Sequence, residues 1–332
     1  MSTFNLNKIS QHSQELMGFS AILILICHAV GNGVKMPTVL SILLNFGNIG
    51  VDIFLFLSGM GLLYSLQSKG GGKNWYSRRY KRILIPYMLI AVPFYTIKVV
   101  IGDSGILDAL YDLSTISYWT HHRSAWFMAL LMPLYAITPL LSKIIDGAKK
   151  RWIPALVLCV VCIVVAVSLK GLGDGWSQNV SAAVQRVPSF ITGYWMGKLI
   201  KDEIVVKSWV LFVVPVVVFA LLFVSPIKIY CFWLLMFPLI VCLLWILERR
   251  PKGKRCFVAI CMFMGTITLE SYLTNGYMAT LLKHVNWTIG GIDLNYGNYA
   301  FYTAVLVLGL LWAVEAHRLS ERILKPKNVK IG

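Results

Sequence analysis

Long runs of apolar residues recur along this chain of 332 residues, and they limit its fold more than any other feature. The hydrocarbon core of a bilayer is about 30 Å thick, so a helix that crosses it needs roughly 20 apolar residues. Ten segments reach or approach that length, and the sixth is short and contains two glycines. The segments run approximately over 16–34, 39–66, 83–101, 125–141, 152–169, 187–200, 208–225, 229–247, 257–281 and 298–316. This pattern predicts an all-α polytopic membrane protein with about ten transmembrane helices in one bundle.

The distribution of charge predicts the orientation of these helices. Hydrophobic residues make up 58% of the chain and charged residues only 14%, against about 25% charged residues in soluble domains. Of the 31 Lys and Arg residues, 24 lie in one alternating set of connections and 7 in the other. Cytoplasmic connections of membrane proteins are enriched in Lys and Arg, so we expect both termini in the cytoplasm. This asymmetry explains the net charge of +17 without a nucleic-acid partner.

The connections between the segments are short, so a single membrane domain is expected over residues 1–332. The longest of them, roughly 102–124 and 282–297, are too short to form a core of their own. Six of the seven cysteines fall inside apolar runs, where cysteine usually serves as a small hydrophobic residue. We therefore expect neither a disulfide framework nor a bound metal.

Three ionisable residues within the apolar runs, His28, Asp52 and Glu270, are the strongest candidates for catalysis. A charged side chain at membrane depth is costly and usually faces protein or water. From the helical rise, we expect all three at one level, about 18–21 Å above the cytoplasmic ends of their segments. An imidazole held by a carboxylate is the usual general base for a hydroxyl, so Asp52 or Glu270 is expected to orient His28. The alternative is a structural role for each: a hydrogen-bonded core histidine and carboxylates that contribute to helix packing.

A basic cluster at the cytoplasmic start of the third segment, RRYKRILIPY at 78–87, is the second candidate. Arg79 and Arg82 are three residues apart and therefore share a helix face. Together with Arg78 they offer planar donor groups that suit phosphates. The alternative interpretation is membrane anchoring, because basic residues next to a transmembrane helix are also what cytoplasmic orientation requires.

The opposite side of the membrane offers a third set of candidates. His122 and Arg123 precede Trp126 in a connection that we expect outside the cytoplasm. They are placed to bind an acceptor substrate, and Ser58 in the second segment completes the predicted substrate-binding set. Adjacent histidines point in different directions on regular structure, so His121 and His122 are not a predicted metal pair.

Six motifs are spread over most of the chain: ELMGFSAILILICHA at 15–29, GVDIFLFLSGMGLL at 50–63, RRYKRILIPY at 78–87, WFMALLMPLYAITPLL at 126–141, FITGYWMGK at 190–198 and GTITLESYLTN at 265–275. Together they resemble the acyltransferase 3 family of integral membrane acyltransferases, bacterial examples of which O-acetylate cell-surface glycans. The resemblance implies that His28 matches the essential histidine of the family's first span and that Arg79 and Arg82 match its R-x-x-R motif. The family often carries an Arg where this chain has Met17, and a His where it has Asn275. Either Lys8 or another basic residue then replaces the missing Arg, or the donor is handled differently.

The resemblance and the residues together predict a multi-pass enzyme of the cytoplasmic (inner) membrane. Acetyl-CoA or another acyl-CoA is the expected donor substrate, and no bound cofactor is expected. The predicted acceptor is a hydroxyl of a cell-envelope or exported polysaccharide or glycolipid, and the lipid bilayer is the other partner. Two alternatives remain: a transporter or flippase that uses the intramembrane His, Asp and Glu, and a catalytically inactive membrane scaffold.

Overall fold

The computed structural model describes residues 3–120, 125–249, 255–283, 288–289 and 292–325, and most of them are helical. Two short antiparallel pairs, β1 (Thr3–Asn5) with β2 (Val205–Lys207) and β3 (Thr288–Ile289) with β4 (Ile292–Asp293), are the only sheets among these residues. The helices are α1 (Asn7–Gln11), α2 (Ser13–Gly31), α3 (Thr38–Asn45), η1 (Phe46–Asn48), α4 (Ile49–Lys69), α5 (Lys73–Val100), α6 (Ile106–Leu113), α7 (Ile116–Thr120), α8 (Trp126–Asp146), α9 (Trp152–Leu172), α10 (Gly175–Val184), α11 (Val187–Lys201), α12 (Ser208–Leu222), η2 (Pro226–Leu235), α13 (Met236–Glu248), α14 (Arg255–Thr266), α15 (Thr268–Leu282) and α16 (Tyr299–Leu324).

The lengths of these helices support the predicted polytopic membrane protein. Within the described residues, seven helical segments are long and apolar enough to cross a membrane. They correspond to the first five, the eighth and the tenth of the segments predicted from the sequence. The sixth and seventh are the shorter helices α11 and α12, each of 15 residues. The ninth is a bent pair of helices, which makes eight spans if the pair is counted as one.

The ninth segment bends by 80° between α14 and α15. Ile267, at the junction, has φ −112° and ψ 25°, outside the helical region. One threonine on each side of Ile267 donates a hydrogen bond from its hydroxyl to the preceding turn: Thr266 to the carbonyl of Phe263, and Thr268 to that of Met264. Such bonds compete with the regular helical pattern and favour a bend. Residues after the bend therefore lie at a different depth from that of one straight helix.

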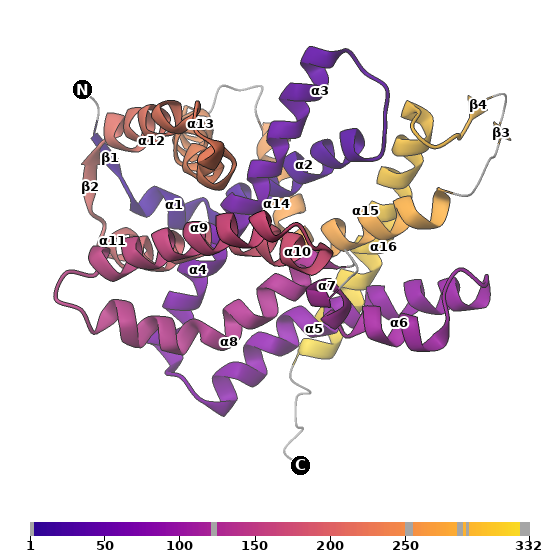
Figure 1. Ribbon diagram of the computed structural model, residues 1–332, viewed down its shortest axis with the longest axis horizontal. Coiled ribbons are helices and arrows are strands. Elements are labelled where there is room, and N and C mark those ends of the chain that lie inside the picture. The colour runs from indigo at the N-terminus through magenta and orange to yellow at the C-terminus, as the bar shows by residue number, and fades with distance from the viewer. Residues whose placement is uncertain (1–2, 121–124, 250–254, 284–287, 290–291, 326–332) are drawn as a thin grey trace.

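The short helix α11 lies inside the bundle, packed along α4 (Figure 1). Glycines allow the two backbones to approach closely, as in many membrane helix pairs. A Cβ atom at Gly193 would stand 1.9 Å from the carbonyl oxygen of Phe56, and one at Gly59 would stand 2.2 Å from that of Phe190. Phe190 and Tyr194 are fully buried. The sixth segment is thus surrounded by protein, so lipid contact does not set its composition.

Helices α2, α4, α5, α8, α15 and α16 all contribute side chains to one buried hydrophobic cluster. Helix α2 packs against α14 and α4, and α15 packs against α16, α5 and α2. In Figure 1, α12 and α13 lie at one edge with the β1–β2 pair, and α6 lies at the opposite edge. This arrangement brings together side chains from the two ends of the chain, and the candidate residues lie among them.

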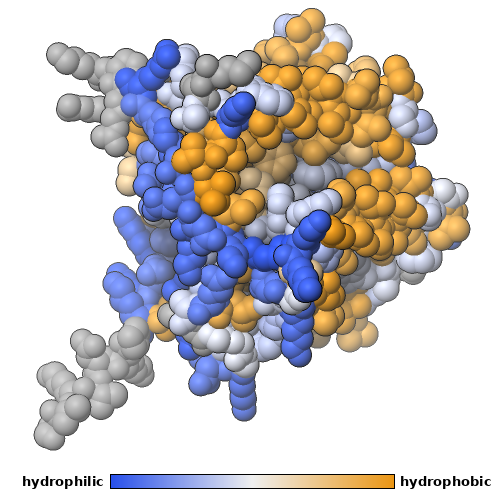
Figure 2. All heavy atoms as spheres, turned by 90° about the vertical axis from the view of Figure 1, so that its left-hand side faces the viewer, coloured by the Kyte–Doolittle hydropathy of each residue, from blue (hydrophilic) through white to orange (hydrophobic). Residues whose placement is uncertain are grey.

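The outer surface is largely apolar, as a lipid-facing surface should be. Most of α9 is exposed, because only 17% of its apolar window is buried inside the protein. Figure 2 shows broad hydrophobic surface on one face of the molecule, with hydrophilic side chains gathered along one border. Of the cysteines, Cys159, Cys231 and Cys261 are buried as expected, whereas Cys242 and Cys256 are exposed on apolar helices. None of the seven is in a disulfide.

Candidate functional site

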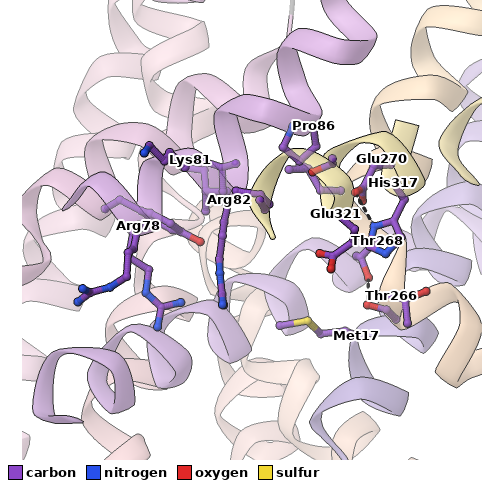
Figure 3. A pocket seen from close by; sticks show the side chains of 18 of the residues that line it. Met17, Arg78, Lys81, Arg82, Pro86, Thr266, Thr268, Glu270, His317 and Glu321 are labelled. Atoms are coloured by element: carbon purple, nitrogen blue, oxygen red, sulfur yellow. Dashed lines mark hydrogen bonds and ion pairs between the residues drawn. The ribbon is translucent and has the colours of Figure 1, made fainter. Parts of the chain in front are cut away.

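A cavity of about 830 Å³ opens among α2, α4, α5, α8, α14, α15 and α16, and we call it the arginine cavity. Figure 3 shows its two walls, with Arg78, Lys81 and Arg82 on one side and Glu270, His317 and Glu321 on the other. The full lining is Met17, Phe54, Ser65, Arg78, Arg79, Lys81, Arg82, Ile83, Pro86, Leu131, Tyr135, Gly265, Thr266, Thr268, Leu269, Glu270, His317, Ser320, Glu321, Leu324 and Lys325.

The basic wall is formed mainly by the first turns of α5. Arg79 is half-buried and donates through Nε to the Ser65 hydroxyl at 2.8 Å, which leaves its terminal nitrogens free to face the cavity. Trp75 donates to the same hydroxyl at 3.0 Å and so fixes it. The four cations of this helix that line the cavity, Arg78, Arg79, Lys81 and Arg82, have no carboxylate partner within 4.0 Å in the part of the chain that the structure describes. The cavity thus offers a cluster of cations without carboxylate partners to an anionic ligand.

The opposite wall carries a hydrogen-bonded pair that the sequence did not suggest. His317 Nδ1 lies 2.9 Å from Glu270 Oε1, and Glu321 lies one turn further along α16. His317 was missed because the tenth apolar segment was expected to end at 316, one residue before it, whereas α16 continues to Leu324. The continuation of the helical pattern through EAHRLSERIL was the available signal.

His28 lies outside the arginine cavity, in the last turn of α2, and its ring is half-buried. Its Nδ1 is 2.8 Å from Asn275 Oδ1 on α15. The Asn275 amide also lies 3.4 Å from the Tyr302 hydroxyl, which donates to the backbone carbonyl of Leu25. Because the Tyr302 proton is committed to that carbonyl, the phenol oxygen accepts from the Asn275 amide, and Asn275 Oδ1 is left to accept from His28.

This chain of hydrogen bonds fixes the state of the imidazole. With its proton on Nδ1, the neutral ring carries a lone pair on Nε2. Among the described residues, none is hydrogen-bonded to Nε2. An imidazole held at Nδ1 with Nε2 open is the arrangement that a general base requires.

The expectation that Asp52 or Glu270 orients His28 is wrong in this structure, since the partner of His28 is the amide of Asn275. Asp52 is fully buried on the side of α4 that faces α11. There it pairs with Arg186 and accepts a hydrogen bond from the Ser189 hydroxyl at 2.7 Å. Both partners flank the start of α11. Asp52 therefore joins α4 to α11, and a cationic partner compensates its burial.

Glu270 also lies apart from His28, and the bend between α14 and α15 is the reason. The depth expected for Glu270 was calculated for one straight helix from residue 257. Because the chain bends by 80° at Ile267, the length of α14 adds little to the height of Glu270. Glu270 stands in the first turn of α15, five residues before Asn275, or about 8 Å nearer the arginine cavity. It lines that cavity and bonds to His317.

A small apolar space, which we call the narrow passage, lies beside the arginine cavity. Its volume is about 10 Å³. Three of its residues, Phe54, Thr268 and Leu269, also line the arginine cavity, so the two spaces are neighbours. Its lining is Ile24, Val51, Phe54, Phe127, Thr268, Leu269 and Tyr272.

One face of α2 extends from the arginine cavity past the narrow passage to His28, and we call this line the route. Met17 lines the arginine cavity, Ile24 lines the narrow passage, and His28 follows. Intervals of seven and four residues place all three on one side of the helix. The eleven residues from Met17 to His28 rise by about 17 Å.

Two further helices show the same order. On α15, Thr268 borders both spaces, Tyr272 borders the narrow passage, and Asn275 bonds to His28. On α8, which runs in the opposite direction, Phe127 borders the narrow passage and Leu131 and Tyr135 border the arginine cavity. Each set is spaced by three or four residues, so three helices present one face each to a common route.

The remaining predicted residues are distributed as follows. Trp126 begins α8 at the His28 end of the route, and its ring packs edge to face on that of Phe127, with the ring centroids 5.8 Å apart. Ser58 is buried on α4 and lines neither space. His122 and Arg123 lie outside the described residues.

The position of the missing family arginine is Met17, and it does line the arginine cavity. Lys8 does not replace that arginine, because its ammonium pairs with Glu248 at 2.7 Å. Arg78, Lys81 and Lys325 instead add cations beyond the R-x-x-R pair.

No group of three or more potential His, Cys, Asp or Glu metal ligands occurs within the described ranges. A family model described as an acyltransferase domain, Acyl_transf_3, matches residues 16–317, which is most of the chain. No curated protein and no solved structure matches the chain.

Proposed function

Because the chain belongs to the acyltransferase 3 family, we propose that this membrane acyltransferase moves an acetyl group from cytoplasmic acetyl-CoA to a sugar hydroxyl. The acceptor is a cell-envelope or exported polysaccharide or glycolipid, and the membrane is the inner (cytoplasmic) membrane. The observation that carries the proposal is that a cavity lined by cations and an imidazole without a hydrogen bond at Nε2 in the described residues lie along the same faces of α2 and α15.

The arginine cavity is suited to the nucleotide end of the donor. Its walls carry five cationic side chains against two carboxylates, and those on α5 have no carboxylate partner in the described residues. Guanidinium groups bind phosphates in a planar, two-pronged arrangement. With the phosphates beside Arg79 and Arg82, the thin pantetheine arm extends along α2 toward His28.

The proposed chemistry at His28 is general base catalysis. Nε2 removes the proton from the acceptor hydroxyl as its oxygen attacks the thioester carbonyl carbon. The new carbon–oxygen bond forms, the carbon–sulfur bond breaks, and the thiolate leaves with the electron pair of that bond. The proton on His28 then passes to the thiolate, which gives the O-acyl ester, free CoA and a neutral imidazole. In the intermediate state, Asn275 Oδ1 stabilises the cationic ring of His28 by accepting the hydrogen bond from its Nδ1–H.

The roles of the two carboxylates follow from their contacts in this proposal. Glu270 and His317 shape the wall of the donor cavity opposite the arginines. Asp52 holds the start of α11 through Arg186 and Ser189. On the far side, Trp126 contacts acceptor beside Tyr272, and His122 and Arg123 of the preceding connection complete the acceptor site.

The proposal includes ten membrane crossings with both termini in the cytoplasm. The seven long helices, the bent pair α14–α15 and the shorter α11 and α12 account for ten apolar segments. The arginine cavity then opens to the cytoplasm, where acetyl-CoA is available. The excess of Lys and Arg in alternate connections supports this orientation.

Transfer of radiolabelled acetyl groups from acetyl-CoA to membrane or glycan fractions tests the proposal. Membranes that contain the protein should transfer label, and membranes with equal amounts of the His28→Ala variant should not. Full transfer by that variant would overturn the proposed chemistry.

One observation favours transport as a second candidate function, namely the bent pair α14–α15 beside the cavity. Transporters use such broken helices, but in matching positions of two inverted halves. Within the described residues only this one pair is bent in that way. Substrate flux without consumption of acetyl-CoA would favour transport, and a scaffold would show neither activity.

A further inference from the structure

Aromatic rings in edge-to-face contact line the narrow passage. The ring centroids of Phe54 and Phe127 are 5.1 Å apart, and those of Phe127 and Tyr272 are 5.3 Å apart, both with the rings edge to face. Tyr272 continues the row to His28, at 5.9 Å. A row of aromatic side chains from α4, α8 and α15 therefore separates the arginine cavity from the imidazole.

We propose that Phe54 and Phe127 restrict the acyl group to two carbons by narrowing this passage, which makes them the residues that determine donor specificity. The inference rests on the proposed function, because it concerns the acyl-CoA that enters by the arginine cavity. The inference goes beyond that function because it names the donor class, short-chain acyl-CoA, and the side chains that select this donor.

The dimensions of the passage support a short acyl group. A free volume of about 10 Å³ is close to the minimum that one water molecule needs. An acetyl group has a single methyl beyond its carbonyl, whereas a butyryl group has two further methylenes. Each added methylene must displace rings that already touch, and close-packed interiors do not absorb such a change readily.

The lining also explains which part of the donor stops outside. Apart from the Thr268 hydroxyl, which is bonded to the carbonyl of Met264, and the Tyr272 hydroxyl, the side chains that border the passage are hydrocarbon. A phosphate in such a space would lose its hydration without a partner. The charged end of the donor therefore stays among the arginines, and only its uncharged acyl end enters the passage.

Helix α4 supplies a matched control for this inference. Phe54 lines the passage, whereas Phe56 points to the opposite side, is fully buried and packs edge-on against Phe237 at 5.8 Å. Replacing either ring by leucine removes a similar volume from the same helix. Only the change at Phe54 enlarges the passage.

The experiment compares acetyl-, propionyl- and butyryl-CoA, each radiolabelled in the acyl group, with membranes that contain the parent protein or a variant. The variants are Phe54→Leu, Phe127→Leu and Phe56→Leu, and the measured quantity is the His28-dependent kcat/KM for each donor. For the parent, we expect a decrease of about 10–200-fold per added methylene. Phe54→Leu and Phe127→Leu should raise the ratio of butyryl to acetyl transfer at least tenfold, and Phe56→Leu should leave it at the parent value.

The outcomes separate this inference from the proposed function. His28-dependent acetyl transfer by the parent supports the function whatever the chain-length profile is. Equal use of butyryl and acetyl by the parent would overturn the inference alone. The inference would also be overturned if Phe54→Leu or Phe127→Leu retained acetyl transfer but kept the parent's ratio of butyryl to acetyl transfer. An equal change of that ratio in Phe56→Leu would overturn it as well. Loss of all transfer in both passage variants while Phe56→Leu stays active would likewise overturn the inference alone. No His28-dependent transfer from any donor by the parent would overturn both.

Discussion

The arginine cavity and the surroundings of His28 border the same helices, yet they are built in opposite ways. The cavity is wide and open, and the cations on α5 lack carboxylate partners in the described residues. Around His28, Asn275, Tyr302 and the carbonyl of Leu25 satisfy one another's hydrogen bonds. Unpaired charge suits a ligand that arrives with its own counter-charge, whereas a fixed tautomer suits proton transfer. The difference predicts that changes at one end affect binding and that changes at the other affect turnover.

The largest effect is expected from His28→Ala. Loss of a general base typically lowers the rate by about 10²–10⁴-fold, so kcat for acetyl transfer should fall by that amount. His12→Ala is the control, because His12 stands at the start of α2, contacts Glu15 at 3.2 Å and lines neither space. A similar loss of kcat in both variants would contradict a specific role for His28.

Changing Arg79 and Arg82 together to alanine should act on binding instead. The loss of two charge-assisted hydrogen bonds to phosphate is expected to raise KM for acetyl-CoA by about 100-fold with little change in kcat. Arg318→Ala serves as the control, since Arg318 is exposed, pairs with Glu315 and does not line the cavity. An unchanged KM in the double variant would indicate that the two arginines only anchor the protein in the membrane.

Asn275→Ala should lower kcat by about 10–100-fold, because the imidazole loses the acceptor that fixes its tautomer and orientation. KM for acetyl-CoA should stay within twofold of the parent value. Ser271→Ala is a suitable comparison: Ser271 is also buried on α15, but it bonds only to the preceding turn. If Asn275→Ala changed KM and spared kcat, the separation between the two ends would be lost.

The smallest effect is expected from Met17→Arg, which adds a cation to the arginine cavity. One further hydrogen bond to phosphate in this partly exposed site should lower KM for acetyl-CoA by about threefold to tenfold. The KM of Met17→Leu, which preserves the apolar character, should match the parent. A higher KM in Met17→Arg would mean that the side chain at this position does not reach the donor phosphates.

Much of the fold was predictable, because apolar length and the distribution of Lys and Arg are properties of the sequence itself. The residues that border the arginine cavity on α5 were predictable for the same reason, since the R-x-x-R spacing fixes their common face. The bend at Ile267 was not, because it depends on threonine hydroxyls that bond to the backbone and on close packing of Gly265 against Gln14. That bend is what separates Glu270 from His28.

The partner of His28 was hidden for a related reason. A search for charge at membrane depth finds carboxylates, but it does not find a neutral amide such as Asn275 on a helix 247 positions away. The narrow passage was equally invisible, because Phe54, Phe127 and Tyr272 read as ordinary apolar or aromatic residues until the helices are assembled. The spacing of residues predicts which of them share one face of a helix. Which faces meet between helices depends on how the helices pack, and the sequence alone did not show this.

The division between binding and chemistry is tested most directly by the dissociation constant of acetyl-CoA for purified protein, measured alongside acetyl transfer. The His28→Ala protein should bind acetyl-CoA within about twofold of the parent and transfer the acetyl group about 10²–10⁴-fold more slowly. The protein with Arg79→Ala and Arg82→Ala should bind about 100-fold more weakly. Loss of donor binding in His28→Ala, or parent-like binding in the double arginine variant, would contradict a donor cavity that is separate from the imidazole it serves.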